Sequence, residues 1–133
     1  MFEWKPEYSV QIPDIDAQHQ QLFALAATLH TAMMQGKGMA VLAKALADLL
    51  NYTRKHFADE ERLMAQYQFP DIEKHKVEHA KLTAQVVEFQ DRFRRKEAFL
   101  TVDLMQFLKT WLAQHISRSD QKYAALIRGK MAA

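Results

Sequence analysis

The positions of the histidines constrain this chain more than any other feature of its sequence. The 133 residues include six histidines. Five of them, together with two acidic residues, interrupt stripes of apolar residues that recur at helical spacing. Because a four-residue step returns to the same face of an α-helix, His56 and Glu60 share one face, and His75 and His79 share another. We therefore expect helices that bury these polar side chains along with their apolar neighbours.

Glycine and proline divide the chain into its expected elements. There are only three of each, and they fall between the periodic segments, as breakers do. At 133 residues the chain has the length of one domain, so we expect a single domain over 1–133. Its parts are an extended N-terminal arm at about 1–15 and helices at about 16–36, 39–67, 70–97 and 101–128. Short links make sequential helices antiparallel, so the sequence predicts an all-α, up-down-up-down antiparallel four-helix bundle with the arm packed on it.

Local signals indicate where these helices begin and end. Asp14 and Asp16 are both good N-cap residues for the first helix, and the Gly-Lys-Gly at 36–38 ends it. Pro70 fits the first turn of the third helix, where its missing N–H is no loss. Thr101 is a candidate N-cap for the fourth helix. The third helix is expected to end near Glu97.

Composition excludes several classes of protein. The absence of cysteine rules out disulfides, thiolate zinc sites and iron–sulfur clusters. No apolar run approaches about 18 residues, so a membrane-spanning helix is not expected. The net charge of +2 gives no reason to expect nucleic-acid binding, and the basic cluster at 92–96 is typical of a helix C-terminus. We expect a cytoplasmic protein that binds neither nucleic acid nor membranes.

The polar residues of the apolar stripes should meet at one end of the bundle. In an antiparallel bundle the start of the first helix, the end of the second, the start of the third and the end of the fourth share one end. The residues placed within roughly 20 Å of that end, at about 1.5 Å per residue, are His19, His56, Glu60, His75, His79, His115 and Asp120. His30 lies about 16 Å further along the first helix than His19, so we expect it to be structural.

So many buried polar side chains favour a metal site. One such histidine alone is usually a hydrogen-bonded core residue, but seven together are costly to bury without something to bind. Seven donors exceed the four ligands of a structural zinc site and the capacity of one six-coordinate ion, so two ions are expected. Imidazole and carboxylate without thiolate favour iron or manganese. The Glu-x-x-His motifs of ferritin-like bundles and the His-Glu-x-x-His motif of zinc hydrolases are absent.

Four motifs resemble the signature of the hemerythrin family. They are Asp16-x-Gln18-His19-x-x-Leu22-Phe23, His56-Phe57-x-x-Glu60-Glu61-x-Leu63-Met64, His75-x-x-x-His79 and His115-Ile116-x-x-x-Asp120-x-x-Tyr123. The resemblance covers nearly the whole chain, with all seven ligand positions in family order. The length is similar to that of the single-domain bacterial members.

The resemblance implies a cofactor of two iron ions, Fe2+ or Fe3+. Glu60 and Asp120 would bridge both ions, with an oxo or hydroxo group as a third bridge. Of the five histidines, His19 and His56 are assigned to one iron, and His75, His79 and His115 to the other. This count leaves one coordination position open, on the iron with two histidines. A small ligand would bind there.

The function implied is reversible binding of dioxygen for transport, storage or local supply, without enzymatic activity. Reversibility needs a dry pocket, for which the candidate lining residues are Leu22, Phe23, Phe57, Leu82, Trp111, Leu112 and Ile116. We expect a monomer with dioxygen as its ligand and a reductase or an oxygen-consuming protein as its partner. Two alternatives stay open: a sensor of oxygen, iron or redox state that acts through a partner, and a di-iron enzyme that handles peroxide or nitric oxide.

The spacing of His115 and Asp120 leaves two structural solutions. The two residues are five apart, which turns them about 140° from each other on a regular α-helix. Either Asp120 reaches across a wide two-metal cluster, or the helix carries a π-bulge between them, as helices at functional sites often do.

Overall fold

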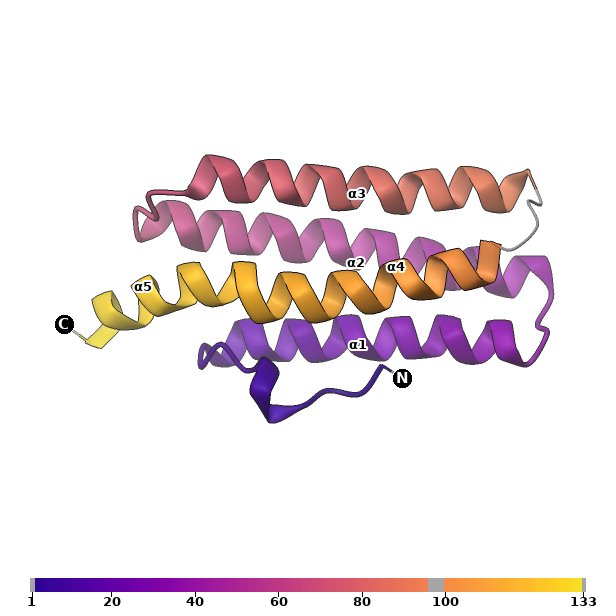
Figure 1. Ribbon diagram of the computed structural model, residues 1–133, viewed down its shortest axis with the longest axis horizontal. Helices are drawn as coiled ribbons and strands as arrows, with labels where there is room; N and C mark the ends of the chain where they lie inside the picture. Colours follow the sequence, from indigo (N-terminus) through magenta and orange to yellow (C-terminus); the bar gives the residue numbers. More distant parts are fainter. Residues whose placement is uncertain (1, 96–99, 133) are drawn as a thin grey trace.

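The structure, a computed structural model, describes residues 2–95 and 100–132. Its elements in chain order are the short 3₁₀ helix η1 (Pro6–Tyr8), the helices α1 (Pro13–Met34), α2 (Met39–Gln66), α3 (Ile72–Arg94) and α4 (Leu100–Gln114), the π-helical turn η2 (His115–Ser119) and α5 (Asp120–Ala132). No strand occurs in these two ranges. Because α4, η2 and α5 follow one another without a break, they form the fourth rod of the bundle (Figure 1).

The order of the rods is the predicted one. The start of α1, the end of α2, the start of α3 and the whole of α5 lie at one end of the molecule, on the left in Figure 1. The predicted up-down-up-down bundle is confirmed. Among the described residues, no helix is both long enough and apolar enough to cross a membrane.

The first helix begins slightly earlier than predicted. Its N-cap residue is Ile12 rather than Asp14 or Asp16, and Pro13 occupies the first helical position, where proline needs no N–H partner. Asp16 lies in the first turn, where a negative charge is favourable. Its carboxylate accepts hydrogen bonds from Ser9 Oγ at 2.5 Å and from the backbone N–H of Val10 at 2.8 Å. Asp16 therefore ties the arm to the helix instead of capping it.

The third helix starts slightly later than predicted, and Thr101 is not the N-cap of the fourth. Gln68 has a positive φ of 56°, and the N–H of Phe69 donates to Met64 O at 2.9 Å, which closes the end of α2. This turn includes Pro70, so α3 starts two residues later. Thr101 lies inside the first turn of α4 rather than at its cap. α3 ends at Arg94, and the predicted end at Glu97 lies outside the described residues.

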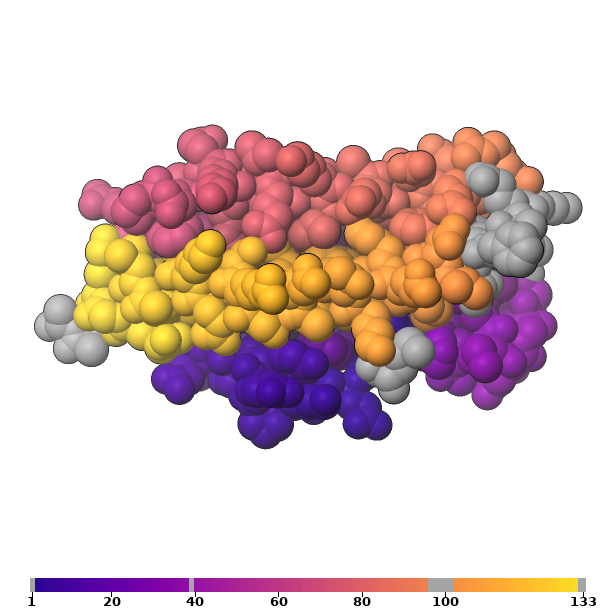
Figure 2. Space-filling model, viewed as in Figure 1, coloured from indigo at the N-terminus to yellow at the C-terminus, as the bar shows by residue number. Residues whose placement is uncertain are grey.

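The N-terminal arm packs on the bundle but is not extended throughout. It contains the helical turn η1, whereas an extended segment was predicted. Gln121 Nε2 donates to Ser9 O at 2.9 Å, and Arg128 Nη1 donates to Val10 O at 2.6 Å. The arm is thus fixed against α5 as well as α1, and it forms the indigo ridge along one edge of the molecule in Figure 2.

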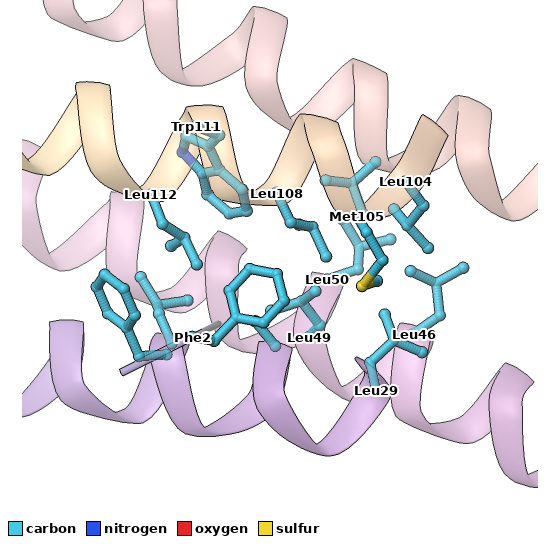
Figure 3. Close-up of a cluster of buried hydrophobic side chains, with 14 of the residues drawn as sticks. Phe2, Leu29, Leu46, Leu49, Leu50, Leu104, Met105, Leu108, Trp111 and Leu112 are labelled. Atoms are coloured by element: carbon cyan, nitrogen blue, oxygen red, sulfur yellow. The ribbon is translucent and has the colours of Figure 1, made fainter. Parts of the chain in front are cut away.

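The apolar core has two parts. In the larger one, Leu104, Leu108 and Trp111 of α4 face Leu29 of α1 and Leu46 of α2 (Figure 3). The smaller one lies near the other end of the bundle and consists of Val10, Ile12, Ile15, Met64, Phe69, Tyr123, Ala124 and Ile127. Along α1, His19 of the predicted polar cluster lies between Ile15 of the smaller part and Leu22 of the larger part, so apolar side chains flank it on both sides.

Candidate metal centre

Every rod of the bundle contributes to the predicted cluster. α1 supplies one residue, α2 and α3 supply two each, η2 supplies one, and α5 begins with one; these are His19, His56, Glu60, His75, His79, His115 and Asp120. None of them is more than 5% exposed. The structure therefore brings together all the residues that the sequence placed at one level. His30 belongs to neither of the ligand groups found among the described residues, and it packs instead against the ring of Phe2.

The turn η2 explains how His115 and Asp120 reach the same centre. Its residues follow π-helical geometry, and the N–H of Asp120 donates to His115 O. A π-turn spans five residues, so the two side chains return to one face. His115 Nε2 then lies 3.1 Å from Asp120 Oδ1. Of the two solutions that the spacing allowed, the π-bulge is the one observed.

Glu60 and Asp120 stand at the middle of the cluster. Glu60 Oε1 lies 3.1 Å from His56 Nε2, and Asp120 Oδ1 lies 3.1 Å from His75 Nε2. His19 Nε2 faces both carboxylates, at 3.0 Å from Asp120 Oδ2 and 3.7 Å from Glu60 Oε2. Each carboxylate thus faces imidazoles from more than one helix.

The potential ligand atoms form two groups that share these carboxylates. Within each group the atoms lie within 4.8 Å of one another. One group is Glu60, His75, His79, His115 and Asp120, and the other is His19, His56, Glu60 and Asp120. The geometry thus has the form of two adjacent cation sites with two common ligands.

Several buried polar atoms of the cluster have no hydrogen-bond partner among the described residues. They are both ring nitrogens of His19, Nε2 of His56, His79 and His115, Glu60 Oε1 and Asp120 Oδ2. Leaving a buried polar atom unpaired costs about 1–3 kcal/mol, so such a convergence needs a cation to bind. Imidazole and carboxylate donors without thiolate suit iron. The residues present therefore fit the iron pair.

The electrostatics of the cluster keep its carboxylates ionised. Burial alone would raise the pKa of Glu60, but the neighbouring imidazoles of His56 and His19 lower it well below its ordinary value. The pKa of Asp120 is lowered in the same way, since His115 and His19 outweigh burial and the charge of Glu60. Conversely, burial lowers the pKa values of His19 and His115, but the carboxylates outweigh it and raise them to about 9 and about 10. The carboxylates of Glu60 and Asp120 thus place two negative charges at the centre, where a cation would bind.

Outer hydrogen bonds orient three of the imidazoles. His56 Nδ1 donates to Gln18 Oε1 at 2.7 Å, and His79 Nδ1 donates to Glu61 Oε2 at 3.0 Å. Because an amide or carboxylate oxygen accepts the bond, Nδ1 is the donor, and Nε2 is the nitrogen that faces the cluster. A second bond holds the acceptor of His56: Gln18 Nε2 donates to Asp59 Oδ2 at 3.1 Å, which fixes the orientation of the amide.

The same arrangement occurs at the π-turn. His115 Nδ1 and Ser119 Oγ both donate to Glu78 Oε1, each at 2.7 Å. The hydrogen bond from His115 lowers the pKa of Glu78 to about 2, although burial opposes the shift. On the inner side, the buried hydroxyl of Tyr123 donates to Glu60 Oε2.

Sequence reasoning assigned none of these outer residues, yet it contained a usable signal. Gln18, Glu61 and Glu78 each stand next to a predicted ligand in the sequence. One residue step turns a side chain about 100° around a helix, from the core face to the flank beside the next helix. A polar residue at that position can therefore reach a histidine on the neighbouring rod.

The predicted pocket residues are mostly buried side by side. Six of the seven belong to the larger apolar core: Leu22, Phe23, Phe57, Trp111, Leu112 and Ile116. Leu82 is only partly buried and lines a surface cavity of about 260 Å³ between α3 and α4. The arm adds two aromatic residues to this lining that were not predicted. The ring centroid of Trp4 lies 6.4 Å from that of His19, and Tyr8 stacks on Phe23 at 5.2 Å between ring centroids.

Fold and site together define a four-helix protein with a buried site for two cations. Comparison with known proteins agrees, since residues 10–127 match the family model described as the hemerythrin HHE cation binding domain. The chain therefore belongs to the hemerythrin family, as its four motifs predicted. The pair of iron ions expected from the sequence is the cofactor of a hemerythrin domain, and the cluster has the residues to hold it.

Relatives resemble this chain over most of its length. A bacteriohemerythrin from Pseudomonas paraeruginosa is 35% identical over 130 residues, which cover 96% of this chain and 82% of that protein. A myohemerythrin from Riftia pachyptila is 33% identical, covering 92% and 90%. The crystal structure of a wild-type hemerythrin matches with a TM-score of 0.86 at 29% identity, covering 94% of this chain and 96% of that one.

Proposed function

We propose that this protein holds two iron ions in the cluster and binds dioxygen reversibly, as a carrier, a store or a local supply. The observation that carries the proposal is the pair of ligand groups joined by Glu60 and Asp120. Membership of a family whose relatives include a myohemerythrin supports it. In this proposal residues 1–133 act as one domain and as a monomer, with a reductase or an oxygen-consuming protein as partner.

The two ligand groups suggest which residue serves which ion. One iron takes three imidazoles and the other takes two, while both share the bridging carboxylates; the assignments are His75, His79 and His115 for the first, His19 and His56 for the second, and Glu60 and Asp120 for both. The side with fewer imidazoles is the one with room for a small ligand. When bound, an iron pair of this kind supplies reversible two-electron exchange with dioxygen.

The protein's own contribution is to orient the ligands and keep the site dry. Gln18 fixes the ring of His56, and Tyr123 fixes the carboxylate of Glu60. Trp4 and Phe57, which lie against the rings of His19 and His56, are bulky and carry no ionisable group. Exclusion of water protects a bound reactive ligand from side reactions, which favours reversible binding over turnover.

The surroundings of the two-histidine side also favour a carrier over an enzyme. General acid–base catalysis requires a proton donor or acceptor within hydrogen-bonding reach of the substrate. The ring contacts of His19 and His56 described in the structure are with each other and with Trp4 and Phe57. The apolar rings of Trp4 and Phe57 on this side favour a dry binding site.

Cycles of air and argon test the proposal. The protein is reduced without oxygen, its iron is counted, and visible absorption is followed as the gas is exchanged. A coloured state that appears in air and disappears under argon, at two irons per chain, supports the carrier. Irreversible oxidation on first exposure, with turnover of peroxide or nitric oxide, would instead make the protein a di-iron enzyme.

A further inference from the structure

The two halves of the cluster differ in the groups that support their imidazoles. In the three-histidine half, His79 and His115 donate to carboxylates, those of Glu61 and Glu78. In the two-histidine half, His56 donates to the neutral amide of Gln18. The Nδ1 of His19 has no hydrogen-bond partner among the described residues. One half is thus supported by negative charge, and the other is not.

The charge difference is larger than these direct contacts alone suggest. Glu78 and Glu61 are only 39% and 29% exposed, so solvent screens their charges incompletely. In the two-histidine half, the carboxylate of Asp59 lies behind Gln18 and is paired with the guanidinium of Arg62. Outside the shared ligands, a cation in the three-histidine half therefore faces two more negative charges.

Outer carboxylates strengthen metal binding in two ways. A carboxylate that accepts the Nδ1 proton of a ligand imidazole fixes the ring orientation and makes Nε2 a better donor, and losing such a partner typically costs about 10–100-fold in metal affinity. His19 has no such partner on Nδ1, and its ring is held by packing and by the shared carboxylates that face Nε2. The two-histidine half should therefore bind a divalent ion more weakly.

Access from the surface also favours earlier metal binding in the three-histidine half. His75, His79 and His115 each line a surface cavity, with volumes of about 40, 580 and 260 Å³. Neither His19 nor His56 lines any of these three cavities. Instead, Trp4 of the N-terminal arm lies against His19.

We propose that the two halves of the cluster bind metal in a fixed order, the three-histidine half first, and that Glu61, Glu78 and Gln18 are the positioning residues that set this order. The order rests on the proposed function, because it requires a cluster that holds two ions. Its consequence is that a form with one ion exists, in which the half with room for a small ligand is still empty. Dioxygen binding would then depend on the occupancy of the weaker half.

Anaerobic titration of the metal-free protein with Co2+ tests this order, followed by calorimetry and by the visible absorption of the bound ion. The expected result is two steps of one ion each, with the first at least about tenfold tighter. His56→Ala, which removes a ligand that belongs only to the two-histidine half, should keep the tight step and weaken or remove the second. If His56→Ala removes the tight step instead, the order is the reverse.

Conservative variants test the positioning residues without emptying the cluster. Glu78→Gln should weaken the first step by about 10–100-fold and shift its absorption spectrum. Gln18→Glu should tighten the second step and so reduce the difference in affinity between the two steps. Glu73→Gln is the matched control, because Glu73 is on the same helix as Glu78 but is 85% exposed beside Lys76, and it should change neither step. Circular dichroism shows whether each variant is folded.

The possible outcomes distinguish a failure of the proposed binding order from a failure of the proposed function. Two ions bound in one step by the parent protein, or a Glu78→Gln variant that weakens only the second step, would overturn the order and leave the proposed function intact. Fewer than two ions per chain at saturating Co2+ would overturn both.

Discussion

The hydroxyl of Tyr123 offers a clean test of the energetics of the cluster. Tyr123 is fully buried, and its hydroxyl donates to Glu60 Oε2. Burial and the charges of Glu60 and Asp120 raise the pKa of Tyr123 well above its ordinary value, so the phenol keeps its proton and acts as a donor. Tyr123→Phe removes only that donor.

The expected cost follows from the kind of bond that is lost. A hydrogen bond to a charged group is worth about 1.5–3 kcal/mol. The phenyl ring would keep its edge contacts with His75 and Phe69, at 5.4 and 6.3 Å between centroids. The substitution therefore leaves almost no cavity, and a cavity adds little to its cost. We therefore expect the free energy of unfolding to fall by about 1.5–3 kcal/mol.

Urea unfolding of the metal-free protein near neutral pH measures this loss. With an m-value of about 2 kcal/mol/M, the midpoint should fall by about 1 M. Tyr67→Phe is the control, because Tyr67 packs against the same apolar cluster but its hydroxyl makes no hydrogen bond to the described residues; its effect should stay within about 0.5 kcal/mol. An unchanged midpoint for Tyr123→Phe, or an equal fall for Tyr67→Phe, would refute the reasoning.

Three further predictions concern the ligands, the charges and the packing. His79→Ala should lower the iron content measured after reconstitution, whereas His30→Ala should leave it unchanged; equal iron in both variants would show that His79 is not a ligand. The raised pKa values of His19 and His115 stabilise the metal-free fold fully below about pH 6.5, and this stability is lost as the pH rises through about 9 and about 10. The midpoint of thermal unfolding of the metal-free protein should therefore fall as the pH rises from about 6.5 to about 10. A midpoint that does not change with pH would contradict the raised pKa values of the two histidines. Phe57→Ala should destabilise the protein by about 3–5 kcal/mol, since the ring is buried and stacks on His79 at 3.8 Å between centroids; denaturant unfolding that shows less than about 1 kcal/mol would contradict this packing.

The fold and the cluster were predictable because one repeating signal reports both. The four-residue steps from His56 to Glu60 and from His75 to His79 lie in register with apolar positions, so the helical period predicts which side chains are buried. Antiparallel order then sets their depth, without any knowledge of side-chain packing. Family resemblance added the choice of iron.

Features that depend on local competition were not predictable. The first helix starts three residues earlier than predicted, because Pro13 takes its first position in place of a cap at Asp14 or Asp16. The third starts two residues later, because the turn that follows the positive φ at Gln68 includes Pro70. The spacing of His115 and Asp120 allowed two solutions, and only the backbone could distinguish them. The outer hydrogen bonds depend on which flank of each helix faces its neighbour, which the period alone does not specify.

The most direct test of the central claim is the dioxygen uptake of the fully reduced protein, with iron counted on the same sample. Two ion sites joined by shared carboxylates lead us to expect one dioxygen bound per two irons, and the same amount returned when the oxygen pressure is lowered. Uptake that is not returned, or equal uptake by protein that holds only one iron, would contradict the account.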